Sequence, residues 1–200
     1  MPRRTKKADR TRASLLKAAL RVISRKGYTA ATVEEIVKEA GVSKGLAYYH
    51  FKNKAALAAA VLQDGVDSLI AEFERIAAES SHASEALMGM FDAFADVVVD
   101  NKEFGRFFSN ELWRNGRVWS DEMHEREQRL VAVISDQFRR GQEEGTIDAS
   151  SDATFMAVAS IGLVLTTSVC YFSERPIAEP IDKEEFAARV YAFVRKAALS

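Results

Sequence analysis

The feature that most constrains the fold of this chain is its lack of helix breakers, since only three prolines occur among 200 residues. Proline removes a backbone N–H and clashes with the preceding helical turn, so stretches without it can form long helices. In these stretches apolar residues recur at helical spacing, as at Leu16, Leu20 and Ile23. Hydrophobic residues make up 48% of the chain and charged residues 28%, which is typical of a globular protein. The sequence therefore predicts an all-α protein with a buried core.

The net charge of −1 hides a sharp division along the chain. Residues 1–60 contain 14 Lys/Arg and 4 Asp/Glu, a net charge of +10. Residues 61–200 contain 14 Lys/Arg and 25 Asp/Glu, a net charge of −11. A small basic module on an acidic body predicts that only the first module meets a polyanion, either a nucleic acid or a membrane surface.

Residues 10–53 have the pattern of three helices separated by glycines. The first helix is predicted to begin near Arg10 and to stop at Gly27, because glycine readily adopts the left-handed conformation that ends helices. Thr32 is followed three residues later by Glu35, a capping-box pattern that predicts the start of the second helix.

The second helix is predicted to end at Gly41, and Ser43 is placed to cap a brief third helix that reaches about Tyr49. Two helices joined by a short turn containing glycine are typical of a helix-turn-helix. The short third helix fits the major groove of DNA, which is about 12 Å wide. The predicted domains are a flexible basic arm at 1–9, a helix-turn-helix DNA-binding domain at 10–53 and a helical body at 54–200.

A more specific pattern follows the first helix, where Gly27-Tyr28 precedes the run TVEEIVKEAGVSKGLAYYHFKNKAAL. This pattern resembles the TetR (tetracycline-repressor) family of transcriptional regulators over about residues 10–60. The resemblance implies an N-terminal three-helix helix-turn-helix DNA-binding domain fused to a helical-bundle ligand-binding and dimerisation domain. Residues 61–200 resemble that family only in length and helical style.

The resemblance also implies roles for single residues. Lys44 and Tyr48 are expected to face base edges, and Gly45 allows close approach to the groove because it has no Cβ. The family usually has Thr or Ser where this chain has Leu46, so an apolar contact, for example to a thymine methyl group, replaces a hydroxyl contact there. Donors to phosphate oxygens are expected at Thr32, Ser43, Tyr49 and His50.

Lys54 is predicted to lie at the N-terminus of the fourth helix, where its ammonium and free backbone N–H groups would hold one phosphate together. Simpler roles stay open at this stage. Tyr48 and His50 can be packing residues, and Lys54 can be a solvated surface charge. The basic arm at 1–9 is either solvated or reaches the minor groove or the phosphates of DNA.

The body is predicted to contain a fourth helix from Lys54 to about Glu79 and five further helices, at 84–100, 103–114, 118–144, 151–173 and 183–198. Eight aromatic residues lie between positions 91 and 138, and they indicate either an ordinary helical core or an apolar cavity between helices. Glu111 would orient a ligand there or simply lie on the exposed face of a short helix. The candidate ligand contacts are Phe91, Phe94, Phe108, Glu111, Trp113 and Phe138.

The sequence lacks the motifs of the common catalytic and metal sites. His124-Glu125 begins a zincin-like pattern, but Gln128 occupies the position of the second histidine. There is no glycine-rich phosphate loop and no G-x-S-x-G nucleophile elbow. Cys170 is the single cysteine, which excludes an intrachain disulfide. We therefore expect no enzymatic activity, no metal and no cofactor.

Residues 155–172 form an uncharged run of 18 residues, near the lower limit for a membrane span. Serine and threonine lower its hydropathy, so it is interpreted as a helix buried on all sides of a protein that does not enter a membrane. The resemblance places the homodimer interface on the last two helices, at about 151–173 and 183–198. Small residues would let a partner helix approach closely at Ala157, Ala159, Ser160 and Gly162.

Together these patterns predict a cytoplasmic, homodimeric repressor of a palindromic double-stranded DNA operator, released by a small apolar effector. Two alternatives remain within the class of regulators: an activator, and a regulator that has no small-molecule ligand. An alternative from another class is a lipid- or drug-binding carrier whose basic arm touches membranes. The Gly41 turn argues against the carrier, because an amphipathic membrane helix has no need of it.

Overall fold

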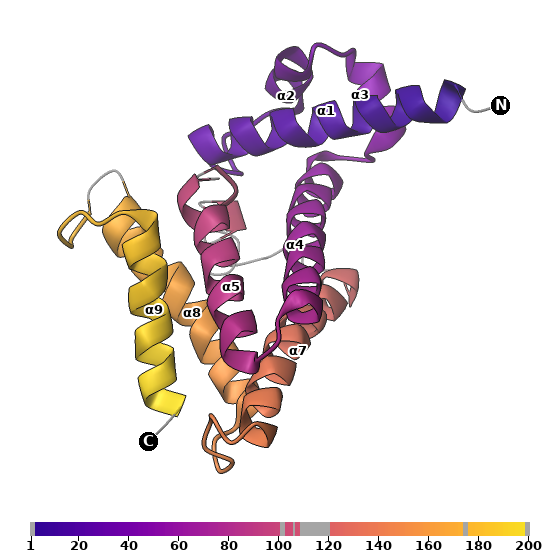
Figure 1. The fold of residues 1–200 in the computed structure, drawn as a ribbon. Coiled ribbons are helices and arrows are strands. Elements are labelled where there is room, and N and C mark those ends of the chain that lie inside the picture. The colour runs from indigo at the N-terminus through magenta and orange to yellow at the C-terminus, as the bar shows by residue number, and fades with distance from the viewer. Residues whose placement is uncertain (1–2, 101–102, 106, 109–120, 174–175, 199–200) are drawn as a thin grey trace. The chain divides into compact units, whose positions relative to one another are not determined.

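The computed structural model describes residues 3–100, 103–105, 107–108, 121–173 and 176–198, and every regular element within these ranges is helical (Figure 1). The all-α prediction is confirmed. The chain divides into two compact units, and the boundary between Gly65 and Val66 lies inside helix α4 (Lys54–Glu79). This is later than the predicted boundary at residue 54, because the buried Leu57 and Val61 belong to the first unit.

The first unit is built from α1 (Arg3–Lys26), α2 (Val33–Ala40), α3 (Lys44–His50) and the first turns of α4. Helix α1 packs against both α2 and α3. Its inward stripe recurs at the spacing of an amphipathic helix and meets the apolar side of α2. The most deeply buried of these side chains are Leu15, Ala19, Val22 and Ile36.

Helix α1 begins at Arg3, whereas the sequence predicted a flexible arm up to residue 9. No glycine or proline lies between Arg3 and Lys26, so nothing in the local sequence stops the helix from extending toward the N-terminus. The basic residues of the predicted arm therefore lie on a helix, and a flexible arm is not found over Arg3–Asp9.

The predicted start and stop signals of α2 are both confirmed. The Thr32 hydroxyl accepts a hydrogen bond from the Glu35 backbone N–H at 3.2 Å, and the Glu35 carboxylate accepts one from the Thr32 N–H at 3.1 Å. Gly41 ends the helix in the left-handed conformation with φ of 66°, and its N–H donates to the Lys38 carbonyl at 3.2 Å. This conformation turns the chain so that α3 can start three residues later, at Lys44.

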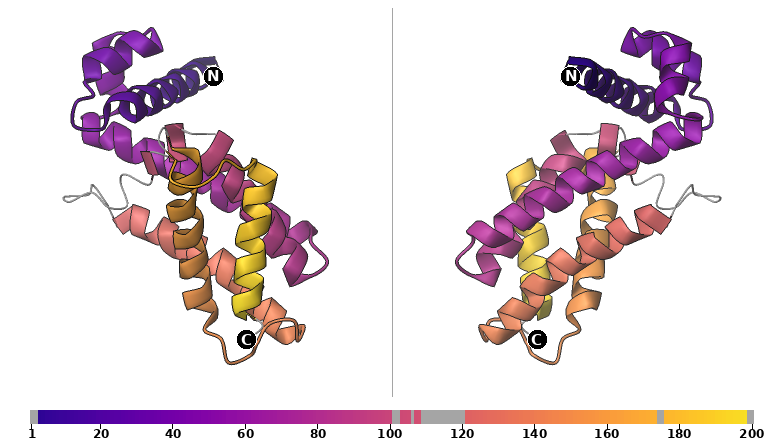
Figure 2. Two further views of the ribbon diagram at one scale, coloured as in Figure 1. Left: turned by 90° about the vertical axis from the view of Figure 1, so that its left-hand side faces the viewer. Right: turned by 90° about the vertical axis from the view of Figure 1, so that its right-hand side faces the viewer.

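The second unit contains the later turns of α4, α5 (Ala83–Ala95), the π-helix η1 (Asp96–Asp100), α7 (Asp121–Glu143), α8 (Ala153–Phe172) and α9 (Lys183–Ala198). Helix α5 packs against α7, α8 and α9, and both views in Figure 2 show α8 beside α9. Salt bridges join α7 to α4, from Arg126 to Asp67 at 2.8 Å and from Arg129 to Glu74 at 2.7 Å. Phenylalanines fill the centre, with Phe73, Phe138 and Phe186 almost fully buried.

Two helices of this unit have ends that differ from the predicted ones. The helix expected at 84–100 keeps α-helical hydrogen bonding only to Ala95 and continues as the π-helix η1. Three consecutive valines, at 97–99, follow that point, and their branched Cβ atoms crowd a regular helix. The helix expected at 118–144 is α7, at Asp121–Glu143. Most of the one expected at 103–114 lies outside the described residues.

The sequence predicted that helix α8 is buried on all sides, and this prediction is wrong for the single chain. By length and composition it is apolar enough to cross a membrane, with a mean hydropathy of 1.9, yet only 28% of its most apolar window is buried. Ala157 and Ser160 pack inside the unit, whereas Ala159 and Gly162 are exposed. The helix therefore has one face in the core and one apolar face at the surface of the single chain.

The spacing of apolar residues in α9 predicts a buried face with Phe186, Val190, Phe193 and Ala197, and the structure buries the first two of these. The buried residues include Phe186, Val190 and Val194, while Phe193 is 64% exposed and Ala197 is also exposed. Phe193 lies outside the arc of buried side chains on this helix, so its ring is at the surface of the protomer. An outward phenylalanine on this helix has no partner in the protomer's core.

The conformation of Gly41 gives a testable prediction about stability. Open space surrounds both Gly41 and Gly45, so an added Cβ meets no atom within 4 Å at either position. Gly41→Ala is expected to destabilise the protein by about 1–2 kcal/mol, because an alanine is strained at this positive φ. Gly45→Ala should instead stabilise α3 by about 1 kcal/mol, the difference in helix propensity. Urea denaturation of the two variants measures both effects. A free energy of unfolding in Gly41→Ala equal to that of the unsubstituted protein would contradict the left-handed conformation of Gly41.

Candidate nucleic-acid interface

Helix α3 presents nearly all of its side chains to solvent. Only Ala47, at 3% exposure, is buried among its seven residues. Tyr48 is 47% exposed and Tyr49 is 77% exposed, which leaves two aromatic rings and their hydroxyl groups at the surface. A short helix held by one small residue leaves the rest of its surface available to the bases and backbone of DNA. The exposed side chains of this face are Lys44, Leu46, Tyr48 and Tyr49, with Gly45 between them.

Local hydrogen bonds and packing fix the position of α3. The Ser43 hydroxyl accepts from the Leu46 backbone N–H at 3.2 Å and thereby caps the start of the helix, as predicted. The Ser14 hydroxyl of α1 donates to the Ala40 carbonyl at the end of α2, at 3.2 Å. Phe51 is buried just after α3, and the Arg12 guanidinium of α1 lies over its ring at 5.7 Å. Helix α1 therefore supports the turn and the far end of α3.

Lys44, a predicted base contact, has a partner within the protein. Its ammonium forms an exposed ion pair with the Glu34 carboxylate of α2 and lies 6.0 Å from the centre of the Tyr48 ring. The hydrogen bond between them lowers the pKa of Glu34 and raises the pKa of Lys44 from their ordinary values. Exposed ion pairs contribute little to stability, so an incoming phosphate or base can replace this carboxylate at small cost.

Lys54 has a role in the structure that the sequence did not indicate. Its ammonium donates to three backbone carbonyls of the α1–α2 connection, those of Tyr28 at 2.8 Å, Thr29 at 3.2 Å and Ala31 at 2.8 Å. It also lies 4.6 Å from the centre of the Tyr28 ring. A lysine ammonium has three N–H donors, so all of them have partners here. A phosphate contact by this ammonium would have to share or displace these carbonyls.

The remaining predicted phosphate donors differ in how available they are. Thr32 is exposed, but its hydroxyl is engaged in the capping box with Glu35. His50 is only partly exposed, and its Nε2 is buried without a hydrogen-bond partner among the described residues. Its ring meets the Tyr49 ring edge-on at 5.2 Å between centroids. Ser43 and Tyr49, the other two predicted donors, are both exposed.

Ion pairs within the first unit leave its surface cationic. The three glutamates of α2 each pair with a base: Glu34 with Lys44, Glu35 with Lys26 and Glu39 with Arg21. In the described part of the chain no ion pair involves six further exposed cations of this unit: Arg10, Arg12, Lys17, Arg25, Lys38 and Lys52. Local pairing thus neutralises the three carboxylates of α2, the helix that precedes α3.

Four of the predicted ligand residues are among those that the structure describes, and these four do not line one common cavity. Phe91 and Phe94 are buried in the second unit, where they line an interior space of only about 10 Å³. Phe138 lines a larger cavity of about 400 Å³ between α5, α7 and α9. Phe108 is buried but groups with the first unit. Glu111 and Trp113 lie outside the described residues.

Comparison with known proteins identifies the family of this chain. Residues 15–61 match the family described as "Bacterial regulatory proteins, tetR family". The transcriptional regulator TtgR of Pseudomonas putida is 32% identical over 182 residues, which cover 82% of this chain and 83% of TtgR. The chain belongs to the TetR family. It is therefore a DNA-binding transcriptional regulator with an N-terminal helix-turn-helix, and the carrier alternative is not favoured.

Solved structures of TetR-type regulators share the whole fold. FadR from Bacillus subtilis, in complex with stearoyl-CoA, superposes with a TM-score of 0.81 at 19% identity and covers 91% of this chain and 96% of its own. AibR, in complex with isovaleryl coenzyme A and operator DNA, gives a TM-score of 0.73 at 20% identity, with coverage of 92% and 97%. The helical second unit therefore has the same architecture as the corresponding part of these regulators.

The three carbonyl contacts of Lys54 generate a prediction for this TetR-family protein. Lys54→Met should destabilise it by about 1.5–3 kcal/mol, because buried or partly buried carbonyls lose a charged donor. The matched control is Lys52→Met, which removes an equal charge from an exposed position two residues earlier. Urea denaturation should show a loss of stability in Lys54→Met alone. Equal stability of the two variants would contradict the structural role of the Lys54 ammonium.

Proposed function

We propose that this regulator is a cytoplasmic, homodimeric repressor that leaves its operator when a small apolar ligand binds the second unit. The observation that supports it most directly is the set of side chains on α3, where two tyrosines and a lysine stand exposed on a helix fixed by one buried alanine. Similar regulators with bound acyl-coenzyme A molecules support a ligand-responsive second unit. The chain has no evident catalytic motif, and we propose no enzymatic activity for it.

The proposed reading of DNA divides the interface into two parts. Lys44 and Tyr48 contact base edges in the major groove, with Leu46 as an apolar contact and Gly45 permitting close approach. Tyr49, Ser43, Thr32 and the first turn of α4 contact the phosphates, which position the protein without selecting sequence. In a homodimer the two copies of α3 would lie about 34–36 Å apart, one turn of DNA, so the operator would be palindromic.

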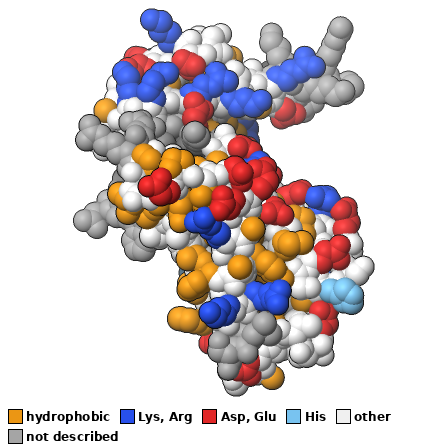
Figure 3. All heavy atoms as spheres, turned by 60° about the vertical axis from the view of Figure 1, so that its left-hand side comes forward, with side chains coloured by type: hydrophobic (Ala, Val, Ile, Leu, Met, Phe, Trp, Pro, Cys, Tyr) orange, Lys and Arg blue, Asp and Glu red, His pale blue; other side chains and the backbone are white. Residues whose placement is uncertain are grey.

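The proposed homodimer uses the outward faces of α8 and α9. Large apolar side chains are exposed on both helices: Phe155, Val158 and Val169 on α8, and Phe193 on α9. Figure 3 shows hydrophobic side chains gathered on this side of the second unit. The exposed Ala159 and Gly162 of α8 have no bulky side chain, so a partner helix can approach closely. Exposed apolar patches of this kind are typical of interfaces between subunits.

Helix α4 is the proposed route by which a ligand acts on DNA binding. It is one continuous helix from Lys54 to Glu79, and it contributes Val66, Ile70 and Phe73 to the core of the second unit. A ligand that displaces these residues would move Lys54 and the carbonyls it binds. The ligand weakens DNA binding only if it prefers the displaced conformation, and by linkage the operator then weakens ligand binding by the same factor.

The DNA-reading proposal is tested with operators selected from a randomised duplex library. Lys44→Ala and Tyr48→Ala should each reduce the preference for the selected operator over random DNA by about 1–3 kcal/mol per lost base contact. Arg139→Ala, a substitution of an exposed arginine on α7, is the control and should change neither affinity. Equal losses on operator and random DNA for both α3 variants would show that α3 is not the recognition helix.

The dimer proposal is tested by placing a charge on the apolar face. Phe193→Glu should weaken dimerisation by about 100-fold or more, because two buried phenylalanines per dimer are lost and two charges would be buried. Met88→Glu, a similar change at a 48% exposed residue of α5, serves as the control. Sedimentation equilibrium measures the mass of each variant. An unchanged dimer in Phe193→Glu would place the interface elsewhere.

A further inference from the structure

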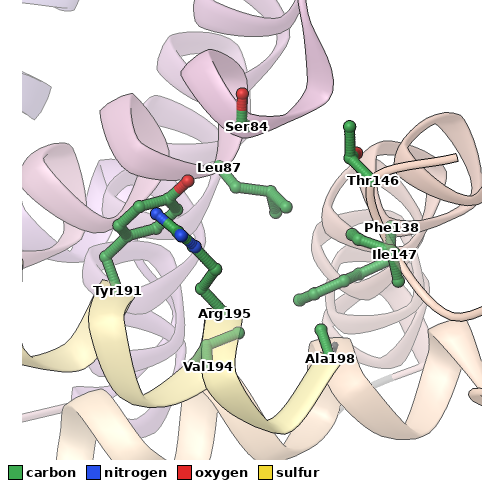
Figure 4. A pocket seen from close by; sticks show the side chains of 9 residues that line it. All are labelled: Ser84, Leu87, Phe138, Thr146, Ile147, Tyr191, Val194, Arg195 and Ala198. Atoms are coloured by element: carbon green, nitrogen blue, oxygen red, sulfur yellow. The ribbon is translucent and has the colours of Figure 1, made fainter. Parts of the chain in front are cut away.

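The cavity of about 400 Å³ in the second unit lies at the ends of three helices that are far apart in sequence (Figure 4). Its apolar wall is formed by Leu87 of α5, Phe138 of α7, Ile147 of the α7–α8 connection and Val194 of α9. Tyr191 and Arg195, also from α9, add polar groups to the same cavity. The volume falls within the usual range of small-molecule sites, about 300–1,000 Å³.

The floor of this cavity is held in place by hydrogen bonds. The Asp148 N–H donates to the Ala198 carbonyl at 2.9 Å, which joins the α7–α8 connection to the last residue of α9. The Gln142 side-chain amide donates to the carbonyls of Asp148 at 3.1 Å and Ser151 at 2.7 Å. Ile147 lies so close to Gly141 that a Cβ there would be 2.5 Å from its Cδ1. These contacts make a preformed site rather than a gap between loose elements.

The charge of Arg195 distinguishes this cavity from the rest of the acidic second unit. Six other arginines of this unit each form a salt bridge with a carboxylate: Arg75, Arg126, Arg129, Arg139, Arg140 and Arg189. Within the described residues Arg195 forms none, although the unit has a large excess of acidic residues. It lies one helical turn after Tyr191, and Figure 4 shows the guanidinium and the phenol group together at one side of the cavity.

We infer that this cavity binds a small amphipathic carboxylate, whose head group pairs with Arg195 and Tyr191 and whose alkyl tail lies against Leu87, Phe138, Ile147 and Val194. A guanidinium matches a carboxylate in a bidentate geometry, and a tyrosine hydroxyl such as that of Tyr191 in the cavity lining can donate to a carboxylate oxygen. A cationic ligand would face the guanidinium, and an uncharged one would leave it without a partner. The inference that this cavity is the effector site depends on the proposed ligand-released repressor. The inference that it binds a carboxylate does not depend on that proposal.

Binding is measured directly on the full chain by isothermal titration calorimetry with hexanoate, octanoate and decanoate, each below its micelle concentration. Affinity should rise about fourfold per added methylene group until the tail fills the cavity. Octan-1-ol and octylammonium have the same tail and serve as head-group controls, and both should bind more weakly than octanoate. No binding by any of the three carboxylates, or equal binding of octanoate and octan-1-ol, would overturn the inference.

Variants then locate the site. Arg195→Gln should weaken octanoate binding about tenfold, the loss of one charged hydrogen-bonding partner at an exposed position, and should leave octan-1-ol unaffected. Lys196→Gln removes the same charge from the next residue, which does not line the cavity, and should change neither affinity. Ser84→Trp, a substitution at an exposed residue on the cavity's edge, should block both ligands. Unchanged octanoate affinity in Arg195→Gln, with thermal stability preserved, would overturn the assignment to this cavity.

A parallel titration against the selected operator separates the site from its regulatory role. Octanoate should lower operator affinity by about 5- to 150-fold in the unsubstituted protein and not in Ser84→Trp. Octanoate binding without any change in operator affinity would support the binding site and would refute its role as the effector site. Operator binding without octanoate binding would be consistent with the DNA-reading proposal and would refute the inference that the cavity binds a carboxylate.

Discussion

The contact on which the first unit most depends is the one between the Lys54 ammonium and the carbonyls of Tyr28, Thr29 and Ala31. The connection between α1 and α2 leaves carbonyl oxygens that no helix satisfies, and unsatisfied polar groups that are partly buried are costly. One ammonium from the first turn of α4 satisfies three of them. Ala31 immediately precedes Thr32, the N-cap of α2, so a movement of α4 acts directly on the start of the helix-turn-helix. In the proposed ligand-released repressor, stability and the transmission of the ligand's effect would therefore depend on the same contact.

The parts of the fold that the sequence predicted correctly are those with strong local signals. Thr32 with Glu35, Gly41 and Ser43 each define a helix end through a hydrogen bond or a backbone conformation that involves only a few neighbouring residues. The bounds of α4 were also predicted, since Asn53 caps its first turn, with the Ala56 N–H donating to the Asn53 Oδ1 at 2.8 Å. The start of α1 was missed because the dense basic residues after Pro2 favour a flexible arm, although a proline at this position is itself typical of a helix start.

The candidate sites were harder to predict because they depend on long-range contacts. The exposure of the α3 face followed from its helical period, but the partners of Lys44 and Lys54 lie 10 and 23–26 residues away. The aromatic residues at 91 and 94 indicated either a helical core or an apolar cavity, and the structure places both side chains in the core. The larger cavity joins side chains from four separate segments, a combination that no local pattern connects: Ser84, Leu87, Phe138, Thr146, Ile147, Tyr191, Val194, Arg195 and Ala198. Of the predicted ligand residues, Phe138 is the one that lines it.

Helix α8 illustrates how a correct pattern can give a wrong conclusion about burial. Its nearly uniform apolar composition predicts that every face meets other apolar groups, and this would hold for a helix at the centre of a single chain. In the protomer one face packs on α7 and α9, while Phe155, at 68% exposure, and Val158 remain at the surface. The hydrophobic effect that buries the first face acts equally on the second, and only a second surface can satisfy it. The proposed homodimer would cover the second face of α8, and it thereby reconciles the uniformly apolar sequence of this helix with its exposure in one chain.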